Sequence, residues 1–112
     1  MDLEVVSNEI LLILRQTARR GSTITYTELV GQIKSARFSP TDPNLFKILC
    51  DISEMENTRG RGMLSAVVIR KHDLRPGQGF FDLARKIGFR FKDDDKFWTE
   101  QLKFVFSRGH QS

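Results

Sequence analysis

The chain has 112 residues, a net charge of +4 and 39% hydrophobic residues, a composition typical of a globular protein that can build one core. Its single Cys excludes an intramolecular disulfide and a multi-cysteine zinc site. The first residues carry acids where a secretory signal carries bases, and no apolar run approaches the roughly 20 residues of a membrane span. We therefore expect one α+β domain over residues 1–112, located in the cytoplasm and not in a membrane.

Two helices are predicted at the start of the chain. Apolar residues recur at helical spacing over residues 3–20, and Gly21 is suited to end that helix. Thr25 and Glu28 have the spacing of a capping box, in which each side chain bonds the backbone N–H of the other residue. A second, short helix should therefore begin at Tyr26.

A third helix is predicted over residues 43–57. Asp42 is a favourable N-cap and Pro43 a favourable first residue. The helix carries one base, Lys47, and with its N-cap has a net charge of −3, from the acids Asp42, Asp51, Glu54 and Glu56. We expect Asp51, Glu54 and Glu56 to be exposed, which makes this helix a poor surface for the major groove of DNA.

The second half of the chain alternates extended and helical patterns. The β-branched run of residues 63–70 predicts a strand, and residues 71–79 have the composition of a turn. Further elements are predicted after the turn: a helix of about two turns from Phe80 to Ile87, an extended stretch over residues 89–92, and a last helix over residues 96–106. The aspartates at 93–95 are placed to cap this last helix.

This order of elements is that of a winged-helix domain, a helix-turn-helix to which a β-hairpin is attached. The segment GSTITYTELVGQI resembles the one that opens the helix-turn-helix of the alkylguanine-DNA alkyltransferase family and of its catalytically inert alkyltransferase-like relatives. The similarity in element order extends from Ile10 to Gly88. The residues that match the motif are Thr25, Tyr26, Glu28 and Leu29.

The chain departs from that family where the chemistry would occur. The family's strand carries Pro-Cys-His-Arg before two valines, and here those positions hold Leu64, Ser65 and Ala66. Alkyl transfer is excluded because the nucleophilic cysteine is missing. The resemblance implies a winged-helix shape and at most a DNA-directed ancestry.

The positive charge is concentrated in one region. Residues 57–92 hold nine Lys or Arg and two Asp or Glu, whereas the segments on either side are net negative. Such an asymmetry indicates a polyanionic partner, and contacts to phosphates supply affinity without reading sequence. The candidate nucleic-acid-binding residues are Arg59, Arg61, Arg70, Lys71, His72, Arg75, Gln78 and Lys86.

The segment RPGQG, residues 75–79, has two interpretations. Its glycines and the helix that follows could form a phosphate site, although the Gly-Lys-Ser/Thr ending of a nucleotide-binding loop is missing. Alternatively it is a structural turn, in which Pro76 fixes φ and Gly77 or Gly79 supplies a positive φ. The sequence leaves both interpretations open.

No residue set indicates catalysis. His72-Asp73 lacks the further ligands of a metal site, since the only other histidine is His110. The Asp93–Lys96 run resembles a fragment of a nuclease site but needs no role beyond capping, and Cys50 has an acid, Asp51, beside it. We therefore predict no catalytic residue, no metal and no cofactor.

The sequence thus favours a non-catalytic winged-helix protein that binds nucleic acid, DNA in the first place, through its phosphate backbone. The alternative is a protein-interaction module, a subunit of a larger assembly or a homodimer. That module would use the Phe-rich C-terminal part of the chain, which includes Phe89, Phe91 and Phe104.

Overall fold

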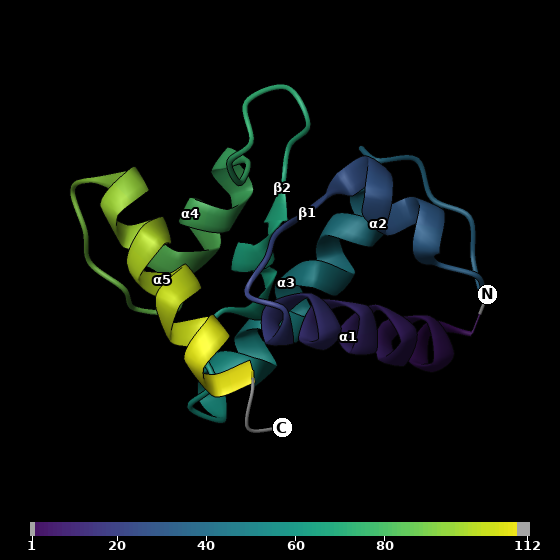
Figure 1. Ribbon diagram of the computed structural model, residues 1–112, viewed down its shortest axis with the longest axis horizontal. Helices are drawn as coiled ribbons and strands as arrows, with labels where there is room; N and C mark the ends of the chain where they lie inside the picture. The colour runs from purple at the N-terminus through teal and green to yellow at the C-terminus, as the bar shows by residue number, and fades with distance from the viewer. Residues whose placement is uncertain (1, 110–112) are drawn as a thin grey trace.

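The computed structural model describes residues 2–109. Within them the chain forms five α-helices, one 3₁₀ helix and two short strands (Figure 1). In chain order these are α1 (Leu3–Arg19), β1 (Ile24–Thr25), α2 (Tyr26–Gln32), α3 (Pro43–Thr58), η1 (Leu64–Val67), β2 (Val68–Ile69), α4 (Gln78–Lys86) and α5 (Asp94–Gly109). None of the described helices is long and apolar enough to cross a membrane.

The helix boundaries predicted from capping patterns are confirmed. Gly21 follows α1 with φ of 62°, and α2 begins with the complete Thr25–Glu28 capping box. Asp42 caps α3 by accepting the Asn44 N–H at 2.8 Å, and Pro43 is its first residue. Each of these capping features involves residues only a few positions apart, so it does not depend on the rest of the chain.

The expected β-hairpin is wrong. β1 and β2 pair in parallel, with Ile24 opposite Val68 and Thr25 opposite Ile69. Parallel strands need a long crossover between them, and here α2 and α3 supply it. An α+β class remains compatible with this arrangement of five helices and one small sheet.

The strand predicted over residues 63–70 is largely wrong as well, because residues 64–67 form the 3₁₀ helix η1. This segment is buried among α1, α3 and α5, and helices offer no backbone ladder to pair with. Side chains satisfy its backbone instead: Ser53 accepts the Ser65 N–H at 2.8 Å, and Trp98 donates to the Ala66 carbonyl at 2.9 Å. Only Val68 and Ile69, which face β1, remain strand.

The core has two parts that meet at η1. The larger part joins α1, α2 and α3, with Leu64 and Val67 from η1 and Val105 from α5. The smaller part is rich in phenylalanine and joins α4 and α5 to Met63 and Ala66. In Figure 1, α1 lies to the right and α4 and α5 lie to the left, and α5 also packs against α1.

Residues 89–92, for which an extended stretch was predicted, belong to no strand in the structure. They form part of the loop between α4 and α5. α5 begins at Asp94, earlier than predicted, and Asp93 caps it by accepting the Lys96 N–H at 3.1 Å. The capping role predicted for the aspartates is therefore confirmed.

Candidate nucleic-acid interface

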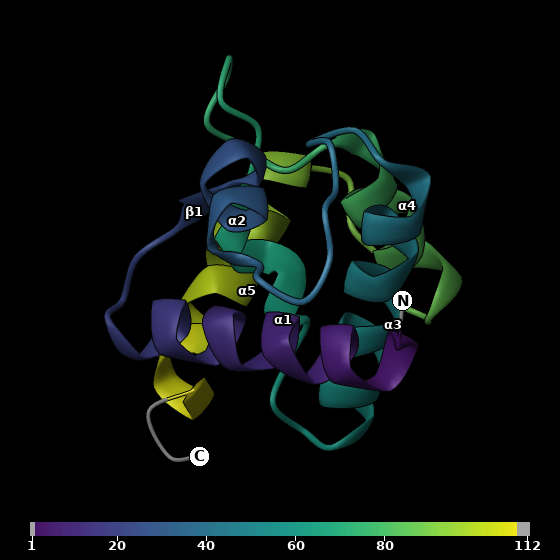
Figure 2. The same cartoon turned by 90° about the vertical axis from the view of Figure 1, so that its right-hand side faces the viewer.

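Residues 70–77, which we call the basic loop, connect β2 to α4 and stand clear of the body of the protein (Figures 1 and 2). The loop closes on itself, because the Arg70 N–H bonds the Arg75 carbonyl and the Leu74 N–H bonds the Arg70 carbonyl, both at 2.9 Å. Pro76 is buried at its base. The sequence-predicted residues Arg70, Lys71, His72 and Arg75 are thus held on one structured turn.

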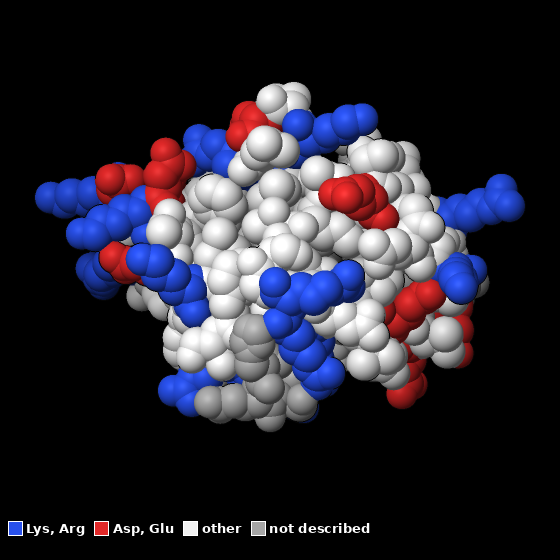
Figure 3. Space-filling view, viewed as in Figure 1, with Lys and Arg blue, Asp and Glu red and all other residues white. Residues whose placement is uncertain are grey.

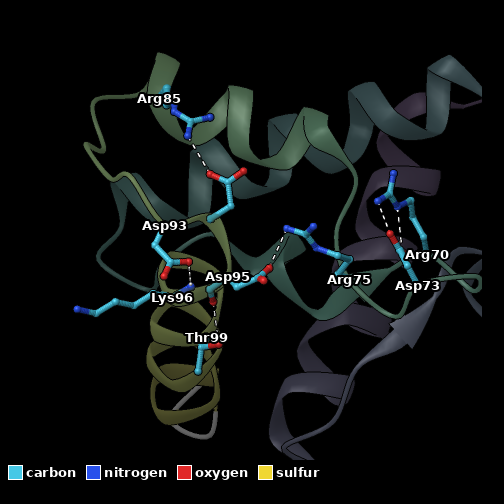
Figure 4. A network of polar contacts seen from close by, with 9 residues as sticks. Arg70, Asp73, Arg75, Arg85, Asp93, Asp95, Lys96 and Thr99 are labelled. Atoms are coloured by element: carbon cyan, nitrogen blue, oxygen red, sulfur yellow. Dashed lines mark hydrogen bonds and ion pairs between the residues drawn. The ribbon is translucent and has the colours of Figure 1, made fainter.

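Two of these bases are neutralised within the loop or beside it. Arg70 donates to both carboxylate oxygens of Asp73, with Nε 3.1 Å from Oδ1, and this hydrogen bonding lowers the pKa of Asp73. Arg75 pairs with Asp95 of α5 at 2.8 Å and lies over the Phe81 ring, 5.6 Å from its centroid. Figure 4 shows both pairs.

The other two bases of the loop are exposed. Lys71 makes no ion pair within residues 2–109, and His72 approaches only Asp73, with Nε2 3.8 Å from the carboxylate. Lys71 and His72 are therefore the loop residues most accessible to an anion.

The loop also contains Leu74, whose backbone has φ of 55° and whose side chain is 61% exposed. For a residue with a Cβ the left-handed conformation costs about 1–2 kcal/mol, and Gly or Asn usually occupies it. The structural interpretation of residues 75–79 is therefore wrong in one respect. The positive φ lies at Leu74, whereas Gly77 has φ of −71° and Gly79 is not among the described positive-φ glycines.

Gly79 of α4 instead packs against the Phe46 ring of α3. A Cβ at Gly79 would lie 2.7 Å from Cε1 of Phe46, so a larger residue would require this ring to move. Phe46 is 40% exposed and lies outside the apolar stripe of α3. The second glycine of residues 75–79 is thus in contact with Phe46.

A hollow of about 410 Å³ lies at the foot of the basic loop. Its walls include the aromatic rings of Tyr26 and Phe46, and burial raises the pKa of the Tyr26 hydroxyl. Arg70, Lys71 and His72 line the same hollow. A volume of this size is within the range of small-ligand sites, and Asp42 adds an acid to the aromatic and basic lining.

The remaining predicted residues are not brought to the basic loop. Arg59 and Arg61 lie in the segment between α3 and η1, at the bottom of Figure 1, whereas the basic loop is at the top. Gln78 donates to Asp82 of its own helix at 3.0 Å. Lys86 lines a separate hollow with Cys50 and acidic residues of α3 and α4.

One acid of α3 does not have the exposure expected from the sequence. Glu56 is 2% exposed and forms ion pairs with Arg15 of α1 and with Arg61. Arg61 therefore contributes to the stability of the fold through its ion pair with Glu56. Asp51 and Glu54 remain exposed, so the outer face of α3 is still acidic.

The Lys and Arg side chains visible in Figure 3 lie at several separate places, with acidic side chains among those on the left. That side holds the ends of α4 and α5, where Arg85 pairs with Asp94 at 2.9 Å (Figure 4). The basic residues that are concentrated between positions 57 and 92 of the sequence therefore do not form one continuous patch on the face shown in Figure 3.

Sequence reasoning missed Phe46 and Leu74. Phe46 could have been noticed as an apolar residue lying outside the buried stripe of its helix. Leu74 carries no such signal, because its φ is set by the closure of the loop.

Burial and the neighbouring Asp51 raise the pKa of Cys50, which keeps the thiol protonated at neutral pH. No group of three or more His, Cys, Asp or Glu that could hold a metal ion occurs within residues 2–109, and His110 lies outside the described part.

No protein-family model, curated protein or solved structure matches the chain. The alkyltransferase resemblance thus depends on the sequence alone, through the motif around Tyr26 and the order of the predicted elements from Ile10 to Gly88.

Proposed function

We propose that this protein binds nucleic acid without catalysing a reaction, and that the basic loop makes the contacts to phosphate. The observation that carries the proposal is the placement of Arg70, Lys71 and His72 on one projecting loop beside an aromatic-walled hollow. Cationic side chains on such a loop reach phosphates without entering a groove, and they supply affinity for any sequence.

In this proposal the basic loop serves as the wing of a winged-helix-like protein, although no hairpin supports it. α3 does not serve as a recognition helix, because Asp51 and Glu54 on its outer face would repel the phosphates that flank a major groove. The ten residues from 33 to 42 also separate α2 from α3 by far more than the three or four residues of a helix-turn-helix.

A salt titration with fluorescent duplex and single-stranded oligonucleotides tests this function. The double variant Lys71→Ala/His72→Ala should bind about three- to ten-fold more weakly at low salt, for every sequence, and its log–log salt slope should fall by about one. Fluorescence anisotropy measures both quantities.

Lys103→Ala is the matched control, since it removes an exposed positive charge from α5, away from the basic loop. It should change affinity by no more than about two-fold. A wild-type protein that binds neither oligonucleotide at low salt would overturn the proposed function.

The second candidate is a protein-interaction module, and α1 supplies the observation that favours it. Val5 and Leu12, two turns apart on one helix face, are 51% and 57% exposed. The Phe-rich part is less available, because Phe91 stacks on Phe97 at 4.0 Å and is covered by Arg85 at 4.2 Å. Elution as a monomer at all concentrations would count against a homodimer.

A further inference from the structure

Leu74 is the one residue other than glycine, among those described, that adopts a positive φ. Its side chain is also one of the most exposed large apolar side chains of residues 2–109. The left-handed backbone and the exposed leucine each disfavour this arrangement, and glycine or asparagine would relieve both. Strain of this kind persists where the surrounding structure over-determines it, and it is concentrated at functional sites.

The surroundings of Leu74 hold it in place. Its N–H bonds the Arg70 carbonyl, and Arg70 is in turn fixed by its ion pair with Asp73. The exposed bases Lys71 and His72 belong to the same closed turn. An apolar side chain is therefore presented on a preorganised loop beside a cationic lysine and an imidazole that can hydrogen-bond.

We propose that Leu74 is an apolar wedge, which inserts between adjacent bases of a nucleic acid whose phosphates contact Lys71 and His72. Proteins that unstack a base step use this combination, in which an apolar side chain enters the step and basic groups hold the backbone on either side. The inference rests on the proposed function and assigns to it a mode of binding that alters the stacking of the bases.

A lipid surface would require more than this loop provides. Stable association with a membrane takes two signals, such as an acyl chain together with a basic patch, and a single leucine falls short of one. Base steps, in contrast, accept single apolar side chains. The chemistry of the loop therefore favours nucleic acid.

The experiment compares the wild type with Leu74→Gly and Leu74→Asn, two replacements that tolerate the left-handed backbone. The probe is a duplex with a fluorescent adenine analogue at its centre, whose emission rises when the base is unstacked. The wild type should increase the emission, whereas both variants should bind without increasing it. Their affinity should fall by about five-fold, the loss expected for one partly buried leucine, while their salt slope stays unchanged.

Thermal unfolding provides a second readout. Both variants should be at least as stable as the wild type, because they remove backbone strain. Leu12→Ala, which truncates an exposed leucine on α1, is the control and should change neither emission nor affinity.

The outcomes separate the wedge from the function on which it rests. Binding with a full emission rise in Leu74→Gly, or binding by the wild type without any rise, overturns the wedge and leaves phosphate binding standing. A wild type that binds no nucleic acid overturns both. Sedimentation with phosphatidylserine vesicles that depends on Leu74, in a protein that does not unstack the probe, would assign the loop to a membrane and overturn the wedge.

Discussion

Glu56 shows at the scale of one residue how the chain uses its charges. Burial raises the pKa of this carboxyl, but hydrogen bonds from Arg61 and Arg15 outweigh burial, so that its pKa lies below the ordinary value of 4.5. Arg15 belongs to α1, Glu56 to α3 and Arg61 to the segment that follows α3. One carboxylate therefore ties three parts of the chain together.

Replacing Glu56 with glutamine should destabilise the protein by about 2–3 kcal/mol, because two charge-assisted hydrogen bonds lose their acceptor charge. Urea unfolding of the variant and of the wild type measures the difference. Glu54→Gln, an exposed change on the same helix, is the control and should stay within about 0.5 kcal/mol of the wild type.

The ion pairs of Glu56 also predict that the stability of the protein depends on pH. Because the pKa of Glu56 is lowered on folding, its stabilisation is complete above the ordinary value of 4.5 and is lost as the pH falls through the lower folded value. The difference in unfolding free energy between wild type and Glu56→Gln should therefore shrink below that pH. A difference that stays constant through the acid range would contradict the assignment.

At the scale of elements, α4 meets α3 where the Phe46 ring lies against Gly79. The Phe46 ring occupies the space above Gly79 in which a Cβ would stand. Gly79→Ala should therefore destabilise the protein by about 1 kcal/mol, the low end of overpacking costs, because the Phe46 ring is 40% exposed and can move aside. Chemical denaturation of the variant tests this expectation.

Making the same substitution in a Phe46→Ala variant shows whether the ring contact is the cause. In a Phe46→Ala protein the space is open, so Gly79→Ala should become neutral or stabilising by up to about 1 kcal/mol, since alanine favours a helix. Gly31→Ala in α2, where a Cβ would meet nothing within 4 Å, should stabilise the wild type by about 0.5–1 kcal/mol. Equal costs for Gly79→Ala in both backgrounds would exclude the ring contact as the cause.

At the scale of the whole molecule, acids hold the two arginines of the basic loop. Asp95 at the start of α5 forms an ion pair with Arg75, and Asp73 forms one with Arg70 (Figure 4). A polyanion that binds the loop has to compete with these carboxylates. Asp95 is the weaker competitor because its side chain is 73% exposed.

Asp95→Asn should consequently raise the affinity for duplex by about two- to five-fold at low salt, since it frees Arg75. Asp51→Asn makes the same change in net charge on the outer face of α3 and should have a smaller effect. Anisotropy titrations of both variants decide the matter. Equal gains would show that net charge alone, and not the release of Arg75, controls affinity.

The sequence by itself determined the five α-helices and those of their ends that carry a capping signal. The Thr25–Glu28 capping box, the Asp42 N-cap and the stop at Gly21 were predictable because each interaction closes within a few residues. The same holds for the capping of α5 by Asp93. The position of the basic residues along the chain was also visible.

Only the tertiary structure decided the elements whose state depends on their neighbours. Residues 64–67 have the composition of a strand, yet they form η1 because Ser53 and Trp98 reach their backbone from the surrounding helices. Glu56 resembles any acid on a helix surface until Arg15 and Arg61 close over it. Leu74 is strained only because the basic loop closes through Arg70. Interactions between residues far apart in sequence depend on how the elements pack, and local residue patterns do not encode that packing.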